Sequence, residues 1–379
     1  MGYLLVFIIL CVLQATGSAQ PWPYLNLIES VDWDSNFVTK FSPEQEKEIQ
    51  NICNRMRPNR RDTVIYSANG MYKMTYKAYS LYEKDDLTVE ATYYDSAGNK
   101  LWDETLSFIP EISPTGEWMY GSDNMGCGMI IFYRAVPMLE AVKVVYDCFD
   151  QKKISSDGEF IAAVRSPAIG SEISDLIVVF SADGTELWRR RVRHGNKMVA
   201  VSEDSRYIVA ASNLCEGEWK DYYTKLYFFR KDGQEIGRFV VGPDQLWMRP
   251  VLRQLLISPD GKLTLAVFDA AIMAFETESG EKLWTYFYPD AYWWISEVVF
   301  IPGGDLIAIS VVHAVPRKHR RYINLLDAQG RMHNNMLLEI EEESLNQRQG
   351  LRLRGTSGGE FLIAAGAEKR HLIQLIKRH

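Results

Sequence analysis

The sequence predicts an all-β protein, a β-propeller of about seven four-stranded blades, with six to eight as the possible range. Two short phrases that alternate along the 379-residue chain carry this prediction. The first is YYDSAGNKLW at 93–102, FSADGTELW at 180–188 and FETESGEKLW at 275–284, with weaker copies at 229–237 and 325–333. In each copy an apolar run leads through polar residues and a turn glycine into a second apolar pair. This pattern is typical of a β-hairpin whose glycine supplies a positive φ.

The second phrase marks another tight turn between two short apolar strands. It occurs as ISPTGEWMYG from 112, ISSDGEFIAAV from 154 and ISPDGKLTLAV from 257, with relatives from 66, 201, 301 and 356. Its turn residues recur about every 48 positions, at Gly70, Gly116, Gly158, Ser205, Gly261, Gly304 and Gly359. Two hairpins per period describe a four-stranded antiparallel blade. Because one blade cannot bury both of its faces alone, seven such units are expected to stack radially.

The ends of the chain predict how the ring closes. After Gly359 only two strands fit, EFLIAAG and HLIQLIK, so the last blade lacks a strand. The segment YLNLIESVDW at 24–33 is the candidate to complete it. A helix is expected from Ser42 onward, because Ser42 can cap it, Pro43 suits the first helical position and Gln45 completes a capping box. This helix is expected to pack outside the ring.

The first nineteen residues have the layout of a secretory signal. An apolar run is followed by small residues that end at Ala19. The chain is therefore expected to be secreted or periplasmic, with no transmembrane span after cleavage; an uncleaved membrane anchor is the alternative. The expected organisation is a signal peptide at 1–19, a closing strand and helix at 20–60, and the propeller at 61–379.

The cysteines leave two alternatives open. Cleavage would leave Cys53, Cys127, Cys148 and Cys215. In an oxidising compartment these four residues permit two disulfides in any of three pairings. Free buried thiols are the other possibility.

Composition and motifs exclude several classes of function. A formal net charge of −7 argues against a nucleic-acid partner, which would need a basic face. No metal-binding spacing and no catalytic motif occurs, so neither a metal site nor a catalytic residue is predicted. Two carboxylates brought together by the fold would not be visible in the sequence, and glycan hydrolysis stays open for that reason. A monomer is expected.

One copy of the first phrase resembles a known repeat. The segment AFETESGEKLW, with Ala274, Glu276, Gly280 and Trp284, resembles the tryptophan-docking repeat of quinoprotein-type (PQQ-like) propellers. The resemblance implies that the indole wedges between neighbouring blades, which is a structural role. The similarity to WD40 propellers is architectural only.

The same resemblance extends to other blades but not to the family's catalysis. Trp102 and Trp188 occupy the matching place in their blades, and Ile236 and His333 are expected to replace the tryptophan in two others. Catalytic members of the family carry adjacent cysteines and calcium-binding acidic residues, and neither feature maps onto this chain. No quinone or other cofactor is therefore expected.

One face of the expected propeller is rich in aromatic residues. In a propeller the connections from strand B to strand C and from strand D to the next strand A share one face, and loops on a rigid scaffold commonly carry function. The candidate partner-binding residues on this face are Trp219, Tyr222, Tyr223, Trp247, Arg249, Tyr292, Trp293 and Trp294, interleaved with Asp221, Asp244 and Asp290. The turns of the opposite face are short and polar.

These observations predict a binding or assembly scaffold. Large amphipathic side chains dominate interface hot spots, so the aromatic face is expected to recognise a protein or a cell-envelope glycan. The alternative is an enzyme, a hydrolase or lyase, that acts on a glycan or peptide in the central funnel. Carboxylates or a histidine directed into the funnel would favour the enzyme.

Overall fold

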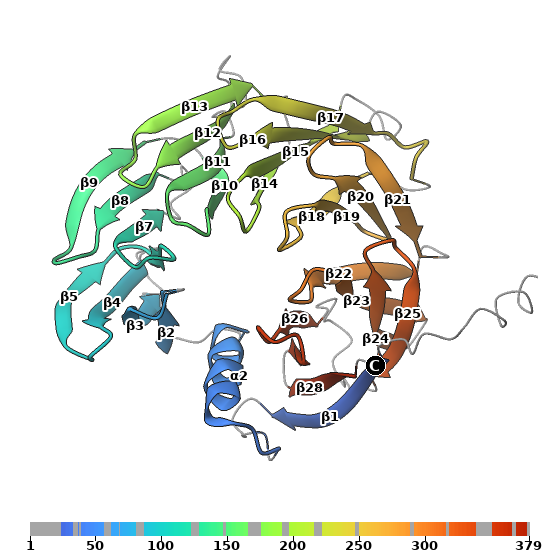
Figure 1. Cartoon of the computed structure of the whole chain (residues 1–379), viewed down its shortest axis with the longest axis horizontal. Coiled ribbons are helices and arrows are strands. Elements are labelled where there is room, and N and C mark those ends of the chain that lie inside the picture. The colour runs from blue at the N-terminus through green and yellow to red at the C-terminus, as the bar shows by residue number, and fades with distance from the viewer. Residues whose placement is uncertain are drawn as a thin grey trace, which may run out of the picture.

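The chain folds into a ring of seven antiparallel sheets. The computed structural model describes residues 24–32, 37, 39–56, 62–67, 69–80, 87–122, 129–146, 149–165, 176–191, 197–215, 222–246, 250–288, 292–315, 318–338, 351–365 and 369–376. Each of the seven sheets has four strands, and the sheets follow one another around the ring as the blades of a β-propeller (Figure 1). The prediction of a seven-bladed all-β propeller is confirmed. The expected signal peptide at 1–19 lies outside the described residues.

The first three blades contain twelve consecutive strands, named A to D in each blade from the centre outward. Blade 1 is β2 (Asp62–Tyr66), β3 (Tyr72–Ser80), β4 (Leu87–Asp95) and β5 (Lys100–Leu106). Blade 2 is β6 (Glu111–Ile112), β7 (Trp118–Ser122), β8 (Ile130–Arg134) and β9 (Glu140–Val145). Blade 3 is β10 (Phe149–Ile154), β11 (Phe160–Arg165), β12 (Leu176–Ser181) and β13 (Glu186–Arg191).

The next three blades repeat this order. Blade 4 is β14 (Lys197–Val201), β15 (Tyr207–Cys215), β16 (Tyr222–Arg230) and β17 (Glu235–Val241). Blade 5 is β18 (Leu252–Ile257), β19 (Leu263–Phe268), β20 (Ala271–Glu276) and β21 (Lys282–Phe287). Blade 6 is β22 (Trp293–Phe300), β23 (Leu306–Val315), β24 (Lys318–Asp327) and β25 (Met332–Leu338).

Blade 7 joins the two ends of the described chain. Its inner strands are β26 (Arg352–Gly355), β27 (Phe361–Ala365) and β28 (Lys369–Ile376). The outermost strand is β1 (Tyr24–Asp32), which pairs antiparallel with β28 from Tyr24 opposite Ile376 to Asp32 opposite Lys369. The prediction that an N-terminal strand completes the last blade is confirmed, although helix α2 (Pro43–Met56) rather than this strand lies between blades 7 and 1.

A buried serine of the second phrase holds the A–B turn closed in blades 1 to 5, and Thr356 does so in blade 7, whereas blade 6 has Ile301 at this position. In blade 5 the Ser258 hydroxyl donates to Asp260 Oδ1 at 2.6 Å and accepts from the Leu263 N–H at 2.8 Å. Ser258 is buried, so this hydroxyl satisfies a backbone group that water cannot reach. All seven predicted turn residues have a positive φ, including Ser205 at 59°. The sequence spacing therefore located every A–B turn.

The apolar core is divided among the blade interfaces. Six clusters of buried side chains lie between consecutive blades, from blades 1 and 2 to blades 6 and 7. A seventh cluster covers the remaining face of blade 7, where Ile363, Ala365 and Leu372 pack against Ile49 and Cys53 of helix α2. Blade 7 is therefore covered by this helix where another blade would be expected.

Helix α2 (Pro43–Met56) lies in the ring between blades 7 and 1, which corrects the prediction that it packs outside (Figure 1). It contacts β27 on one side and β2 on the other. On the blade 1 side, the Lys47 ammonium lies 5.7 Å from the centroid of the Tyr66 ring. The helix takes this place because its apolar residues meet the face of blade 7 that no neighbouring sheet covers.

The start of α2 has the predicted cap. The Gln45 N–H donates to Ser42 Oγ at 3.3 Å, and the Ser42 N–H donates to Gln45 Oε1 at 3.2 Å. This reciprocal pair is a capping box. None of the described residues forms a helix with the length and apolarity that crossing a bilayer requires.

Cys53 is a free thiol, so a framework of two disulfides that uses all four cysteines is absent. Burial raises the pKa of this thiol, against the opposing effect of the nearby Arg370 guanidinium. Cys127 and Cys148 lie outside the described residues, and Cys215 is the last residue of β15.

Candidate functional site

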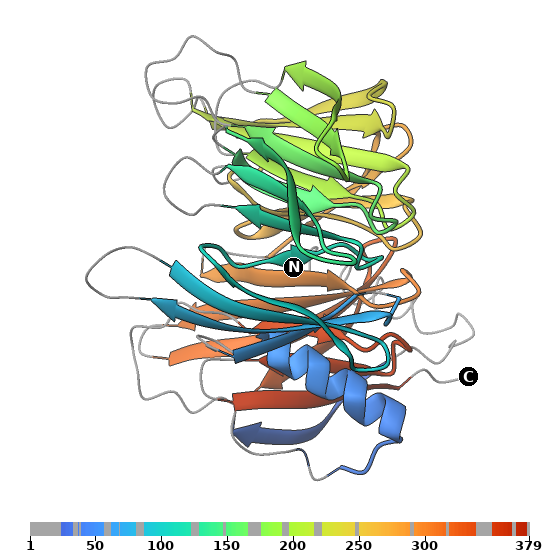
Figure 2. The same cartoon turned by 90° about the vertical axis from the view of Figure 1, so that its left-hand side faces the viewer.

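The two faces of the ring are built differently. Strands of successive blades run between a turn face, which carries the A–B and C–D turns, and a loop face, which carries the B–C and D–A connections (Figure 2). A–B turns such as 155–159 are short, whereas loop-face connections include residues 166–175 and 242–251. Side-chain chemistry that varies between blades can therefore gather on the loop face.

Part of the predicted aromatic set lies outside the described residues. Trp219, Trp247 and Arg249 belong to that part, as do Asp221 and Asp290. The described members lie at the starts of strands in two blades. Tyr222 and Tyr223 begin β16 of blade 4, whereas Trp293 and Trp294 begin β22 in blade 6 and Tyr292 directly precedes that strand. These five residues are all at the loop-face ends of their strands.

Trp293 is a packing residue of blade 6. Its ring stacks on His313 at a centroid distance of 4.2 Å and an interplanar angle of 7°. The other stacked neighbour is Tyr288 at 5.5 Å. The Tyr288 hydroxyl accepts a hydrogen bond from Asn324 at 2.8 Å, and burial raises its pKa. This aromatic stack fixes the loop-face end of blade 6.

The more accessible aromatic residues are Tyr292 and its counterparts in blade 4. Tyr292 is 58% exposed, and its carbonyl accepts the Ala314 N–H, which ties it to the B strand of the same blade. Tyr222 and Tyr223 are half-buried. The Lys225 ammonium lies 5.2 Å from the Tyr223 ring centroid. The strands of blades 4 and 6 thus hold these partly exposed tyrosine rings on the loop face.

The three tryptophans of the first phrase link consecutive blades. Each is largely buried or half-buried on a D strand, and each indole N–H donates to a backbone carbonyl of the next blade. The bonds run from Trp102 to Ala135 (2.8 Å), from Trp188 to Lys231 (2.7 Å) and from Trp284 to Ala328 (2.8 Å). These residues stabilise the ring, and their indole N–H groups are not available to a ligand.

The residues expected to replace tryptophan in blades 4 and 6 were wrong by one position. Trp188 pairs with Val179 just before the bulge of its hairpin. The same register position is held by Gly237 in blade 4 and by Asn334 in blade 6, rather than by Ile236 and His333. A Cβ at Gly237 would lie 2.3 Å from the Ser279 carbonyl oxygen. The C–D turn of blade 5 therefore packs directly against the backbone of Gly237, in the space that an indole occupies in blades 1, 3 and 5.

The inner strands carry carboxylates that are already paired. Glu111 accepts from Lys152 at 3.2 Å, and Glu297 accepts from Arg354 at 2.6 Å across the interface between blades 6 and 7. Across the described ranges, no group of three or more His, Cys, Asp or Glu residues could hold a metal ion.

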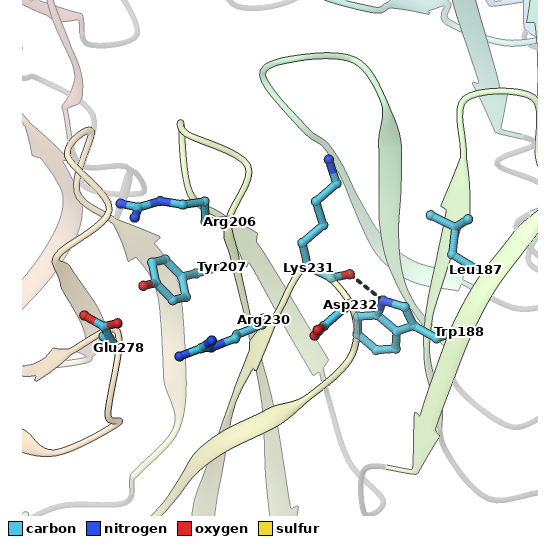
Figure 3. Close-up of a pocket in the computed structure, with 8 residues that line it drawn as sticks. All are labelled: Leu187, Trp188, Arg206, Tyr207, Arg230, Lys231, Asp232 and Glu278. Carbon is cyan, nitrogen blue, oxygen red and sulfur yellow. Dashed lines mark hydrogen bonds between the residues drawn. The ribbon is translucent and has the colours of Figure 1, made fainter.

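A pocket of about 660 Å³ opens on the turn face, where blades 3, 4 and 5 meet (Figure 3). Blade 3 supplies Leu187 and Trp188 from β13, and the C–D turn of blade 5 supplies Glu278. Blade 4 supplies the other lining residues, which are Arg206, Tyr207, Arg230, Lys231 and Asp232. The volume is within the ~300–1,000 Å³ that small-ligand sites occupy.

Two of the three cations in this pocket have partners outside it. Arg206 donates to Asp204 at 2.5 Å, which raises the pKa of the guanidinium. Lys231 donates to Glu159 and lies 3.7 Å from Asp157, and its pKa is raised mainly by the hydrogen bond to Glu159. Sequence reasoning missed this site because its residues span 187–278 and come from three blades.

The comparisons with known proteins give no family. The sequence matches no protein-family model and no curated protein.

Proposed function

We propose that this protein is a secreted or periplasmic binding scaffold that recognises a protein or a cell-envelope glycan through its loop face. The observation that carries the proposal is the asymmetry of the ring. The turn face is made of short turns closed by their own hydrogen bonds, whereas the loop face combines long connections with accessible tyrosines.

The scaffold role is supported by rigidity. Six interfaces between consecutive blades are packed with buried apolar side chains, and α2 covers the free face of blade 7. A site on such a frame loses little conformational entropy when a partner binds. Tyr222, Tyr223 and Tyr292 can then offer large aromatic contact areas to a partner.

The three indole-to-carbonyl bonds between blades support the further proposal that the chain is a non-catalytic relative of PQQ-like and WD40-like propellers. The tryptophans act in blade docking in this interpretation. No cofactor is required for such a role. An enzyme in the funnel is less well supported because Glu111 and Glu297 are held in ion pairs.

The test is affinity capture from an envelope extract with immobilised protein, together with binding to an array of cell-wall glycans. The site variant carries Tyr222→Ala, Tyr223→Ala and Tyr292→Ala and leaves the packing residue Trp293 intact. The control carries Leu283→Ala, an exposed residue of an outer strand.

We expect a ligand to be retained by the parent and by the control and lost by the site variant, with all three unfolding at similar temperatures. Equal retention by all three would contradict a site at these tyrosines. Turnover of a glycan or peptide by the parent would favour the enzyme.

A further inference from the structure

The pocket between blades 3, 4 and 5 combines three cationic side chains, two carboxylates and apolar surface in its lining. We propose that it binds the carboxy-terminal segment of a polypeptide that ends in an apolar residue. This proposal does not depend on the loop face, because the pocket opens on the opposite side of the ring.

The terminal carboxylate would bind Arg230. Among the described residues, Arg206 and Lys231 are already neutralised by Asp204 and by Glu159 with Asp157. The Arg230 side chain is exposed and forms no ion pair with any described residue. A planar guanidinium with free donors suits a carboxylate, which it can bind through two parallel hydrogen bonds.

The apolar side chain would lie on the floor between Leu187, Trp188 and Tyr207. Leu187 lines the pocket and is 51% exposed, which is a large exposed fraction for an aliphatic side chain. Trp188 is fixed by its bond to the Lys231 carbonyl, and the Arg206 guanidinium lies 5.3 Å from the Tyr207 ring centroid. Covering this floor would remove apolar surface from water without rearranging the two rings.

Two carboxylates in the pocket would accept the N–H groups of the peptide. Asp232 Oδ1 accepts the Gln234 N–H at 3.0 Å, and Oδ2 makes no hydrogen bond or ion pair with a described residue. Glu278 reaches the pocket from the next blade (Figure 3). These anions would repel a phosphate or another multiply charged ligand, so they favour a single carboxylate accompanied by backbone donors.

The test compares three synthetic tripeptide probes by isothermal titration calorimetry or ligand-observed NMR. The first is acetyl-Ala-Ala-Leu with a free carboxyl terminus, and the second is its amide. The third is acetyl-Asp-Ala-Leu amide, which carries a carboxylate on a side chain. We expect the free acid to bind at least about fivefold more tightly than either amide, because it alone offers the terminal anion to Arg230.

Variants assign this preference to the pocket. Arg230→Gln is expected to remove the difference between acid and amide, and Leu187→Asp to weaken every probe. The matched control is Arg238→Gln, in the same blade, whose guanidinium is paired with Glu235 outside the pocket. It is expected to leave the preference unchanged. Thermal unfolding of each variant is measured to check that the fold is retained.

Three results would overturn the proposal. These are no binding of the free acid at millimolar concentration, an acid preference that persists in Arg230→Gln, and equal binding of the aspartate-containing amide. The last result would assign the pocket to internal acidic side chains.

Discussion

Gly233 of blade 4 lies directly against the indole of Trp188 in blade 3. A Cβ at Gly233 would lie 2.8 Å from Trp188 Cδ2, and the glycine has a φ of 85°. The glycine of the turn and the tryptophan of the preceding blade are therefore parts of one contact. We expect Gly233→Ala to lower the free energy of unfolding by about 2–4 kcal/mol, the sum of positive-φ strain and overpacking.

Gly98 provides the matched control for this substitution. It occupies the equivalent turn of blade 1 with a φ of 86°, but a Cβ there would have no neighbour within 4 Å. We expect Gly98→Ala to cost only about 1–2 kcal/mol, from backbone strain alone. Denaturant unfolding of both variants measures the difference. Equal costs would show that the indole moves aside freely.

The indole-to-carbonyl bond can be tested in blade 1. Trp102→Phe keeps an aromatic ring but leaves the Ala135 carbonyl without the 2.8 Å bond from Nε1. We expect a loss of about 1–3 kcal/mol in the free energy of unfolding, because a buried acceptor loses its partner. Trp118→Phe, at a half-buried tryptophan whose indole nitrogen makes no hydrogen bond with a described residue, serves for comparison. A smaller cost at Trp102 than at Trp118 would contradict the assigned role.

The A–B turns predict an acid dependence of stability. Burial alone would raise the pKa of Asp260, but hydrogen bonds from Ser258 and the Lys262 N–H outweigh it and lower the pKa. A lowered folded pKa stabilises the native state above the unfolded value of about 4, and this contribution is lost as the pH falls through the folded value.

Ser258→Ala should therefore cost most at neutral pH. We expect about 2 kcal/mol there, and a smaller difference from the parent once the pH falls below the lowered pKa of Asp260, where this carboxyl is protonated in both proteins. Ser279→Ala, which removes a more exposed hydroxyl bonded to Glu276 at 2.6 Å, is expected to have a small effect at any pH. Urea unfolding across the acid range measures both. A cost that does not change with pH would refute the linkage.

The packing of α2 against blade 7 can be monitored by the rate at which a reagent labels the Cys53 thiol. This residue is 2% exposed, so a thiol reagent should reach it only when the helix leaves blade 7. Ile49→Ala removes a neighbouring buried side chain and is expected to speed labelling of Cys53 at least about tenfold, since Ile→Ala substitutions in a core cost about 2–5 kcal/mol.

Mass spectrometry of the peptide that contains Cys53 separates this reaction from labelling of the other cysteines. Glu46→Ala on the exposed side of the same helix serves as the control and should leave the rate unchanged. An unchanged rate in Ile49→Ala would show that α2 and blade 7 open only in global unfolding.

Local features of the fold could be predicted because their causes are local. The positive φ at Gly261, the turn-closing Ser258 three residues earlier and the cap at Ser42 are each encoded within a few residues. The position of α2 could not be predicted in the same way. It depends on which blade faces lack a neighbouring sheet, and that is a property of how all seven blades are arranged.

In the candidate sites, too, features with local causes could be predicted and features that depend on the packing of several blades could not. The aromatic residues at 292–294 were located on the loop face by topology, but sequence could not show that Trp293 stacks on His313 while Tyr292 remains exposed. The pocket joins Leu187 to Glu278, and their proximity is produced by radial stacking. Only the register of the strands revealed that Gly237 takes the tryptophan position of blade 4.

The pairing of β1 with β28 determines how the ring would respond to mechanical load. Tyr24 and Ile376 are opposite each other at the same end of this ladder. Tension applied between these two residues would peel the strands apart one hydrogen bond at a time rather than shear all of them together. In a single-molecule pulling experiment, the ring should therefore open at this seam under low force, before the blades whose strands are connected by hairpins.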